Sequence, residues 1–209
     1  MDEQLSPITG RDRTLAQLVA MVRAQGLRPD ASLRYIADEL GTSHRMLTYY
    51  FGSRDGLLAA VLTAMRNEER ALLTATAADW GLRDAALAMW SYYIDPRRLE
   101  ELRAFFYVFS LALERPEVFA DFLLSMDSWV TVVTDIGIAE GKSRADARAQ
   151  GQLIVSAVRG LLMDRLSTTE PKPVDAAFLL LLDAVIPAPG TTARGSRPKV
   201  ASQRSVSAR

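Results

Sequence analysis

The chain has 209 residues, of which 49% are hydrophobic and 24% are charged, and its 25 basic residues balance its 25 acidic ones. This length and apolar content can bury a sizeable core, in one compact unit or in two small ones. The absence of cysteine excludes disulfides, thiolate metal sites and a cysteine nucleophile. No apolar run comes near about twenty residues and the start has no signal-like segment, so we expect a cytoplasmic protein without a membrane span.

The first predicted helix covers about residues 9–25. Its apolar stripe consists of Leu15, Leu18, Val19 and Val22. Gly26 follows and is suited to end the helix. We expect this helix to pack across the two short helices that come next and to complete a three-helix unit.

Residues 32–58 combine a short helix, a tight turn, a second short helix and the start of a third. Apolar residues of the first short helix fall at i, i+3, i+4 and i+7, namely Leu33, Ile36, Ala37 and Leu40. Ser32 and Ser43 can cap the two short helices, and Gly41 suits a turn with positive φ. Leu47 and Phe51 lie four residues apart and should face the core. The pattern predicts a helix-turn-helix over about residues 32–51.

The outer face of the second short helix carries hydroxyl, imidazole and guanidinium groups, which bind phosphates and base edges. Together with a helix-capping serine upstream and an arginine just downstream, it predicts a DNA-binding set: Ser32, Ser43, His44, Arg45, Met46, Thr48, Tyr49, Tyr50 and Arg54. The alternative is an amphipathic helix with a solvated polar face. Two adjacent tyrosines on a short exposed helix favour a binding partner.

These residues resemble the TetR family of bacterial transcriptional repressors. The resemblance lies in IADELGTS, in MLTYYF and in SRDGLL, which together span residues 36–58. Arg54 stands where the family usually has Lys, and Arg45 where it often has Gly. Thr48 stands where the family usually has a phosphate-contacting Tyr, so Tyr49 and Tyr50 are expected to take over that contact.

The resemblance implies an N-terminal DNA-binding head over residues 1–56 and a helical effector-binding and dimerisation domain over residues 57–187. It implies a homodimer that binds a palindromic double-stranded DNA operator and is released by a small apolar or amphipathic effector.

The rest of the chain is also predicted to be helical, and no segment shows the alternation of a strand between hairpin turns. Trp80-Gly81 should interrupt a long helix, and Asp95-Pro96 should open another. With the three head helices, about nine helices and an all-α fold are expected. The further ranges are about 53–79, 82–94, 95–115, 117–139, 143–166 and 174–186.

Two apolar surfaces stand out in these later helices. Residues 143–166 and 174–186 are apolar on too many sides to face water, so we expect them to form a four-helix interface with a second copy; burial inside one monomer is the alternative. Aromatic residues and methionines on three neighbouring helices could line an effector pocket or simply form core. This second set is Met89, Trp90, Tyr93, Phe105, Phe106, Phe109, Phe122, Met126 and Trp129.

Charge gives the DNA-binding hypothesis no general support. Residues 1–56 contain seven arginines and seven acidic residues, so the arginines would have to cluster on the recognition face. Residues 188–209 contain Arg194, Arg197, Lys199, Arg204 and Arg209 and no acid. This tail is predicted to be disordered, and contact with DNA phosphates is the alternative.

Other functional classes are less well supported. An enzyme is not expected, because His44 is the only histidine and no phosphate loop or catalytic motif is present. The acid pairs Glu68-Glu69 and Glu100-Glu101 are interpreted as solvated helix faces. We expect no cofactor, metal or catalytic residue. The remaining alternative is a helical module that binds a protein instead of DNA, which the neutral head would suit.

Overall fold

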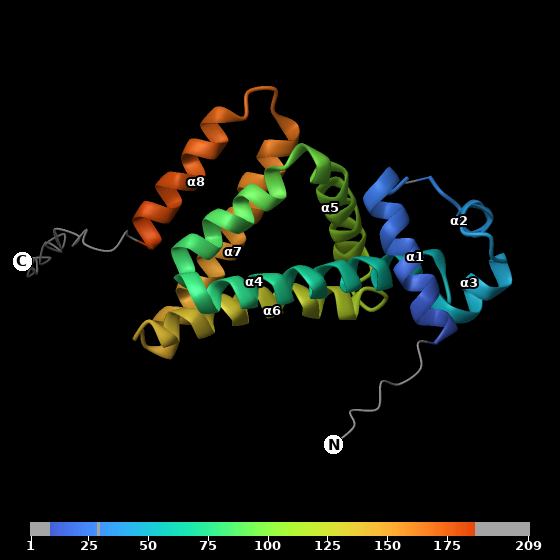
Figure 1. Cartoon of the computed structure of the whole chain (residues 1–209), viewed down its shortest axis with the longest axis horizontal. Coiled ribbons are helices and arrows are strands. Elements are labelled where there is room, and N and C mark those ends of the chain that lie inside the picture. Colours follow the sequence, from blue (N-terminus) through green and yellow to red (C-terminus); the bar gives the residue numbers. More distant parts are fainter. Residues whose placement is uncertain (1–8, 29, 187–209) are drawn as a thin grey trace, which may run out of the picture.

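The structure, a computed structural model, describes residues 9–28 and 30–186. The described residues form eight α-helices and one 3-10 helix and contain no strand, which confirms the all-α prediction (Figure 1). The predicted basic tail, residues 188–209, lies outside the described residues.

The head consists of α1 (Gly10–Gln25), α2 (Leu33–Glu39) and α3 (His44–Phe51), followed by the start of α4 (Arg54–Ile94). Serine caps set three of the helix starts: the hydroxyls of Ser32, Ser43 and Ser53 accept hydrogen bonds from the backbone N–H groups of Tyr35, Met46 and Gly56 at 3.2, 3.2 and 3.0 Å. Gly41 has φ 62° in the turn between α2 and α3. Local sequence therefore fixes the helix-turn-helix, as predicted.

Helix α4 runs from the head into the rest of the molecule, which we call the body. It bends at Gly81, whose φ of 79° lies in the left-handed region that favours glycine, so the predicted break at this position is confirmed as a bend. The backbone N–H of Leu82, just after the bend, donates to the Glu140 carboxylate at 3.2 Å. A side chain from the end of another helix thus satisfies a donor that the bend leaves open.

The rest of the body consists of η1 (Pro96–Arg98), α5 (Leu99–Glu114), α6 (Ala120–Ala139), α7 (Arg144–Ser167) and α8 (Lys172–Val185). Helix α6 packs along both α4 and α7, and α8 packs on α7. The α6–α7 approach is close at Gly151, where a Cβ atom would lie 3.1 Å from the Val130 carbonyl oxygen. Phe178 of α8 stacks on Trp90 of α4 with ring centroids 4.3 Å apart, which joins the last helix to the core.

One sequence expectation needs correction. Helix α6 begins at Ala120, three residues after the predicted start, because residues 116–119 form turns. Among the described residues this is the one helix that is long and apolar enough, by length and composition alone, to cross a membrane. Here it is a core helix: Phe122, Val130 and Val133 on it are buried.

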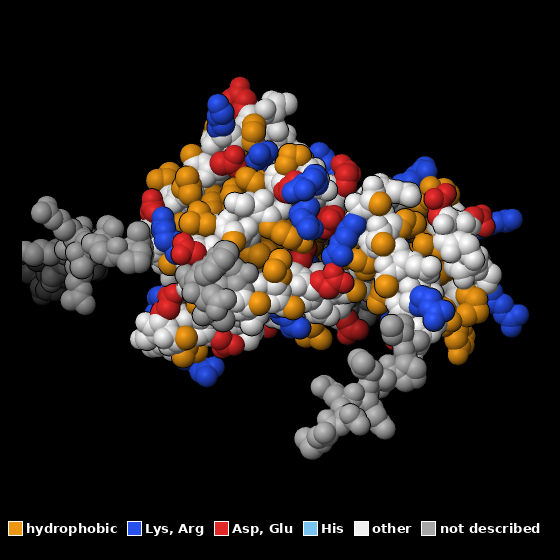
Figure 2. All heavy atoms as spheres, in the orientation of Figure 1, with side chains coloured by type: hydrophobic (Ala, Val, Ile, Leu, Met, Phe, Trp, Pro, Cys, Tyr) orange, Lys and Arg blue, Asp and Glu red, His pale blue; other side chains and the backbone are white. Residues whose placement is uncertain are grey.

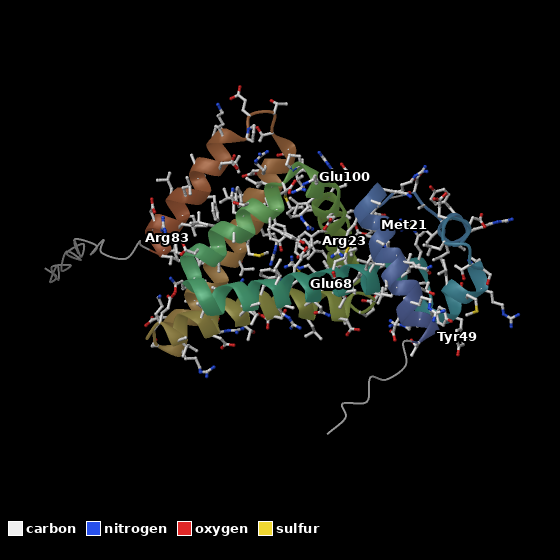
Figure 3. The ribbon with its side chains drawn as sticks, in the orientation of Figure 1. Met21, Arg23, Tyr49, Glu68, Arg83 and Glu100 are labelled. Atoms are coloured by element: carbon white, nitrogen blue, oxygen red, sulfur yellow. The ribbon has the colours of Figure 1, made fainter. Side chains whose placement is uncertain are left out.

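The head contacts the body through α5 as well as through α4. The ion pair between Arg115 at the end of α5 and Asp55 at the start of α4 lies at this junction. Arg23 of α1 donates to the Glu68 carboxylate of α4 at 2.6 Å, and Gly26, just after α1, lies against Glu100 of α5 (Figure 3).

The head should depend on Leu47, which is fully buried between α3 and the other head helices. We expect Leu47→Ala to lower the free energy of unfolding by roughly 2–5 kcal/mol, because it removes buried methyl groups and leaves a cavity. Thr48→Ala, at the exposed neighbouring position, is the control and should change it by no more than about 0.5 kcal/mol. Urea denaturation followed by circular dichroism measures both, and equal effects would contradict the packing described here.

Candidate nucleic-acid interface and ligand cavity

The outward face of α3 is exposed and contains no acidic residue. Its exposed members are His44, Arg45, Met46, Thr48 and Tyr49, together with the capping Ser43. Tyr49 is 79% exposed and lies at the outer edge of the head (Figure 3). Leu47 and Phe51 on the opposite face are buried. The structure thus brings six of the nine predicted DNA-binding residues onto one exposed surface, which we call the α3 face.

Charge and hydrogen-bonding capacity on the α3 face remain available to a partner. Arg45 forms no ion pair with any residue in the described part of the chain. Thr48 donates its hydroxyl to the His44 carbonyl oxygen at 3.0 Å, so it is held within the helix. Figure 2 shows basic and hydrophobic side chains together at this end of the molecule.

Three predicted DNA-binding residues lie elsewhere. Ser32 is exposed but caps α2. Tyr50 is partly buried, and its hydroxyl lies against Gly10 at the start of α1. Arg54 points toward the head–body junction, where it donates to the Ala31 carbonyl oxygen at 2.8 Å and to the Tyr107 hydroxyl at 3.4 Å.

The body contains a mostly apolar cavity of about 100 Å³ that is lined by residues of α4, α5, α6, α7 and η1. Five of the nine predicted pocket residues line it: Met89, Trp90, Tyr93, Phe105 and Trp129. The other four, Phe106, Phe109, Phe122 and Met126, do not. Phe106 and Phe109 pack against the Phe105 ring, and Phe122 and Met126 are buried in the core.

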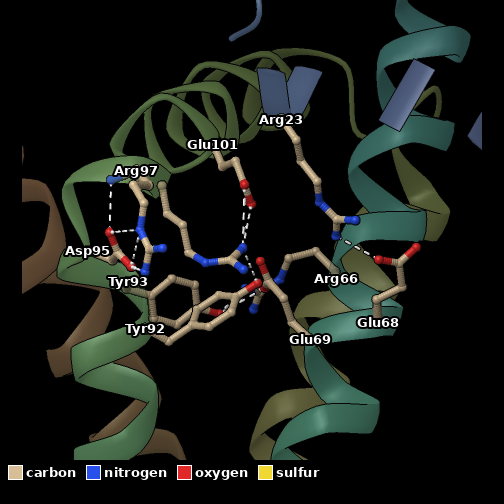
Figure 4. A network of polar contacts seen from close by, with 10 residues as sticks. Arg23, Arg66, Glu68, Glu69, Tyr92, Tyr93, Asp95, Arg97 and Glu101 are labelled. Atoms are coloured by element: carbon tan, nitrogen blue, oxygen red, sulfur yellow. Dashed lines mark hydrogen bonds and ion pairs between the residues drawn. The ribbon is translucent and has the colours of Figure 1, made fainter. Parts of the chain in front are cut away.

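Charged residues also line the cavity, and the sequence analysis missed them. Arg66 donates to the Glu69 carboxylate and to the Tyr93 hydroxyl, both at 2.7 Å, and this hydroxyl donates to Glu69 at 2.9 Å (Figure 4). The Arg66 guanidinium also lies over the rings of Phe105 and Trp129, at 5.0 and 4.6 Å from their centroids. Burial, reinforced by Glu69, raises the pKa of the Tyr93 hydroxyl well above its ordinary value, so it remains a donor.

A second charged group lies beside the first. Arg98 donates to the Tyr92 hydroxyl at 2.7 Å and pairs with the Glu101 carboxylate at 3.2 Å. Burial raises the pKa of the Glu101 carboxyl, against the effect of Arg98 and Arg23. Figure 4 shows this group close to the Arg66 network and to the Arg23–Glu68 pair between head and body.

The sequence interpretation placed both members of the acid pairs Glu68-Glu69 and Glu100-Glu101 in solvent. In the structure, one member of each pair is buried and the other is exposed. The side chains of Glu69 and Glu101 are 8% and 10% exposed, whereas those of Glu68 and Glu100 are 56% and 65% exposed. Neighbouring residues on a helix point about 100° apart, so both members of a pair cannot face the same way. The signal was present: Glu69 continues the stripe of Leu58, Leu62 and Met65, and Glu101 precedes Phe105, Val108 and Ala112 on another.

No family model and no curated protein matches the sequence. Solved structures do match: a protein from Rhodococcus sp. described as a TetR-family transcriptional regulator has 22% identity and a TM-score of 0.64 over 84% of this chain and 97% of its own. A transcriptional regulator from Rhodococcus sp. Rha1 has 20% identity and a TM-score of 0.65 over 85% and 96%.

The chain has the TetR-family fold. A further match is the multidrug binding protein EbrR in complex with imidazole, with 22% identity and a TM-score of 0.61 over 88% of this chain and 98% of its own. At these identities the likeness shows the fold. The TetR-family fold therefore confirms the arrangement that the helix-turn-helix residues predicted, while the residues of the α3 face and of the cavity stand on their own geometry.

Within this TetR-family fold, the Arg66–Glu69 pair should be a structural requirement. We expect Glu69→Ala to lower the free energy of unfolding by roughly 3–5 kcal/mol, because it leaves the buried Arg66 charge without its anion. The control is Glu68→Ala, one residue earlier, which removes the exposed pair with Arg23 and should cost about 1 kcal/mol or less. Chemical denaturation measures both; a Glu69→Ala effect no larger than that of Glu68→Ala would refute the assignment.

Proposed function

We propose that the chain is a cytoplasmic, DNA-binding transcriptional regulator, acting as a repressor that a small-molecule effector releases from a palindromic operator. The observation that carries this proposal is the α3 face: an exposed helix surface without acids that includes Arg45 and Tyr49. The TetR-family fold of the whole chain supports it.

The dimensions of α3 suit the major groove. A helix with its side chains is about 10–12 Å in diameter, and the groove is about 12 Å wide and admits one helix. Arg45 can bind a guanine edge with two hydrogen bonds, and His44 can reach a base edge or a phosphate. The exposed Tyr49 hydroxyl is suited to a phosphate. Arg54, which is held at the junction, would act by positioning the head instead of by touching DNA.

A second copy of the chain would cover the apolar surface of α7 and α8. Leu153, Met163, Leu179 and Leu180 are all at least 48% exposed in the single chain. Burying them between two copies would form a four-helix interface and place two recognition helices about one DNA turn, roughly 34 Å, apart. Each head would bind its half-site weakly, because a head of zero net charge attracts phosphates little. The two heads of a dimer would therefore have to bind together.

The cavity offers a place for the effector because α4 connects it to the head. Arg66 and Glu69 of α4 line the cavity, and Glu68 between them on the helix pairs with Arg23 of α1. If a ligand fits the cavity better when α4 is in one position, its binding favours that position of α4 and of the head attached to it. Only such a difference in affinity between two arrangements can change DNA binding.

The first prediction from this proposal concerns the α3 face. We expect Arg45→Ala combined with Tyr49→Ala to weaken binding to an operator, selected from random duplexes, by at least tenfold, because a base contact and a phosphate contact are lost. The control is Arg103→Ala, which removes an equally exposed arginine from α5. Gel shifts on folded protein measure the difference.

The salt dependence of the same binding separates DNA from a protein partner. Affinity for the operator should fall by orders of magnitude between about 50 and 200 mM salt, because phosphate contacts release counterions. Unchanged affinity in the Arg45/Tyr49 double variant would show that the recognition face is misassigned. A flat response to salt would favour the helical protein-binding module.

The second prediction concerns the dimer. We expect Leu180→Glu to convert the protein from a dimer into a monomer of 23.0 kDa, because it places a carboxylate in the apolar α7–α8 interface. Leu124→Glu is the control: Leu124 is equally exposed, at 69% against 70%, but lies on α6. Sedimentation equilibrium measures both masses. If Leu180→Glu remains dimeric, the interface lies elsewhere.

A further inference from the structure

Two residues that line the cavity each carry a buried hydrogen-bond donor without a partner among the residues that the structure describes. The Nε–H of Arg66 and the Nε1–H of Trp129 are buried and have no acceptor. Both residues line the cavity and are less than 10% exposed. Buried donors without acceptors are rare in folded proteins and cost free energy.

The charges around the cavity are also unbalanced. Arg66 pairs with Glu69, and Arg98 pairs with Glu101. Arg159 of α7, a third cation lining the cavity, forms no hydrogen bond or ion pair with any residue that the structure describes. Burial and the positive charge of Arg66 lower the pKa of the Arg159 guanidinium. The cavity therefore holds one positive charge more than its own acids neutralise.

Arg66 and Arg159 are linked by a pair of stacked rings. The Phe105 and Phe109 rings are nearly parallel, with centroids 6.1 Å apart. The Arg66 guanidinium carbon lies 5.0 Å from the Phe105 centroid, and that of Arg159 lies 5.2 Å from the Phe109 centroid. The rings hold both cations in place without neutralising them.

The rest of the wall is apolar. It includes Met89, Trp90, Ile154, Val158 and Leu162. The cavity of about 100 Å³ is somewhat smaller than the ~150 Å³ engineered cavity that accepts benzene, so it suits a body of about one ring.

We propose that the effector is a small aromatic acid: a carboxylate, which Arg159 neutralises, on an apolar body of about one ring. A cation would add to the net positive charge of the cavity, and a neutral apolar molecule would leave Arg159 without an anion. This inference rests on the proposed function only in naming the cavity as the effector site.

The test compares acids with neutral molecules of the same shape. The probes are benzoate, phenylacetate and 3-phenylpropionate, each paired with its primary amide, and binding to the full-length protein is measured by titration calorimetry. We expect at least one acid to bind tenfold or more tightly than its amide, because only the acid balances Arg159. If every acid binds no better than its amide, or none binds at all, the inference is wrong.

Variants on α7 test the role of Arg159. Arg159→Gln should abolish the preference for the acid and leave amide binding within twofold of the wild type. Arg148→Gln is the control, because Arg148 is an exposed arginine of the same helix that does not line the cavity. An acid preference that survives Arg159→Gln would overturn the assignment.

Thermal unfolding of the free variant separates ligand binding from a structural role. Arg159→Gln should melt at the same temperature as the wild type or a few degrees higher, because the lost charge was partly desolvated and unpaired. A lower melting temperature would show that Arg159 serves the fold, which would overturn the inference.

Failure of this inference and failure of the proposed function give different results. If the free protein binds its operator through the α3 face but shows no preference for acids, only the effector class is wrong. If acids bind through Arg159 but the protein binds no operator, the regulator function is wrong and the acid site stands.

Discussion

Helix α4 constrains both halves of the molecule, because its first turns belong to the head and its later turns line the cavity. Leu57, Leu58 and Leu62 on it are buried in the core, and Arg66 and Glu69 follow on the same side. The hydrogen bonds among Arg66, Glu69 and Tyr93 join the two segments of α4 across the bend. A ligand that disturbs this network acts on the same rigid element that carries the head.

At the proposed effector site, the free protein gives up stability that binding of an acid would recover. Burying a charge is costly unless it is paired, and leaving Arg159 without an acid keeps part of that cost in the free protein. A core selected for stability alone would place a neutral side chain there. Sites where local rules are broken in this way are where function is expected, and a ligand that supplies the missing anion recovers the cost as affinity.

The positions of the helices could be predicted from the sequence. Which buried side chains line the cavity and which fill the core could not. Ser32, Ser43 and Ser53 cap their helices through contacts three residues away, and Gly81 bends α4 by its own backbone preference, so local patterns were enough. Phe105 lines the cavity and Phe122 fills the core, yet both are aromatic residues at helical spacing. Which of them borders a space depends on packing between helices that are distant in sequence. The DNA-binding residues and the domain boundaries remain predictions.

Part of the acidic charge of the neutral head is engaged in contacts within the protein. Asp12 caps α1 in a reciprocal bond with Thr9, and Asp55 pairs with Arg115 at the junction with the body. These two carboxylates are engaged within the protein, Asp38 and Glu39 of α2 are exposed, and α3 itself carries Arg45 and no acid. The local potential at the groove is set by charges within about 10 Å, not by the sum over the domain. A weakly charged head limits non-specific affinity for DNA. Two recognition helices on one dimer would therefore be needed to hold an operator. The pairing of α7 and α8 with a second copy would then affect the fraction of operator bound as much as any base contact.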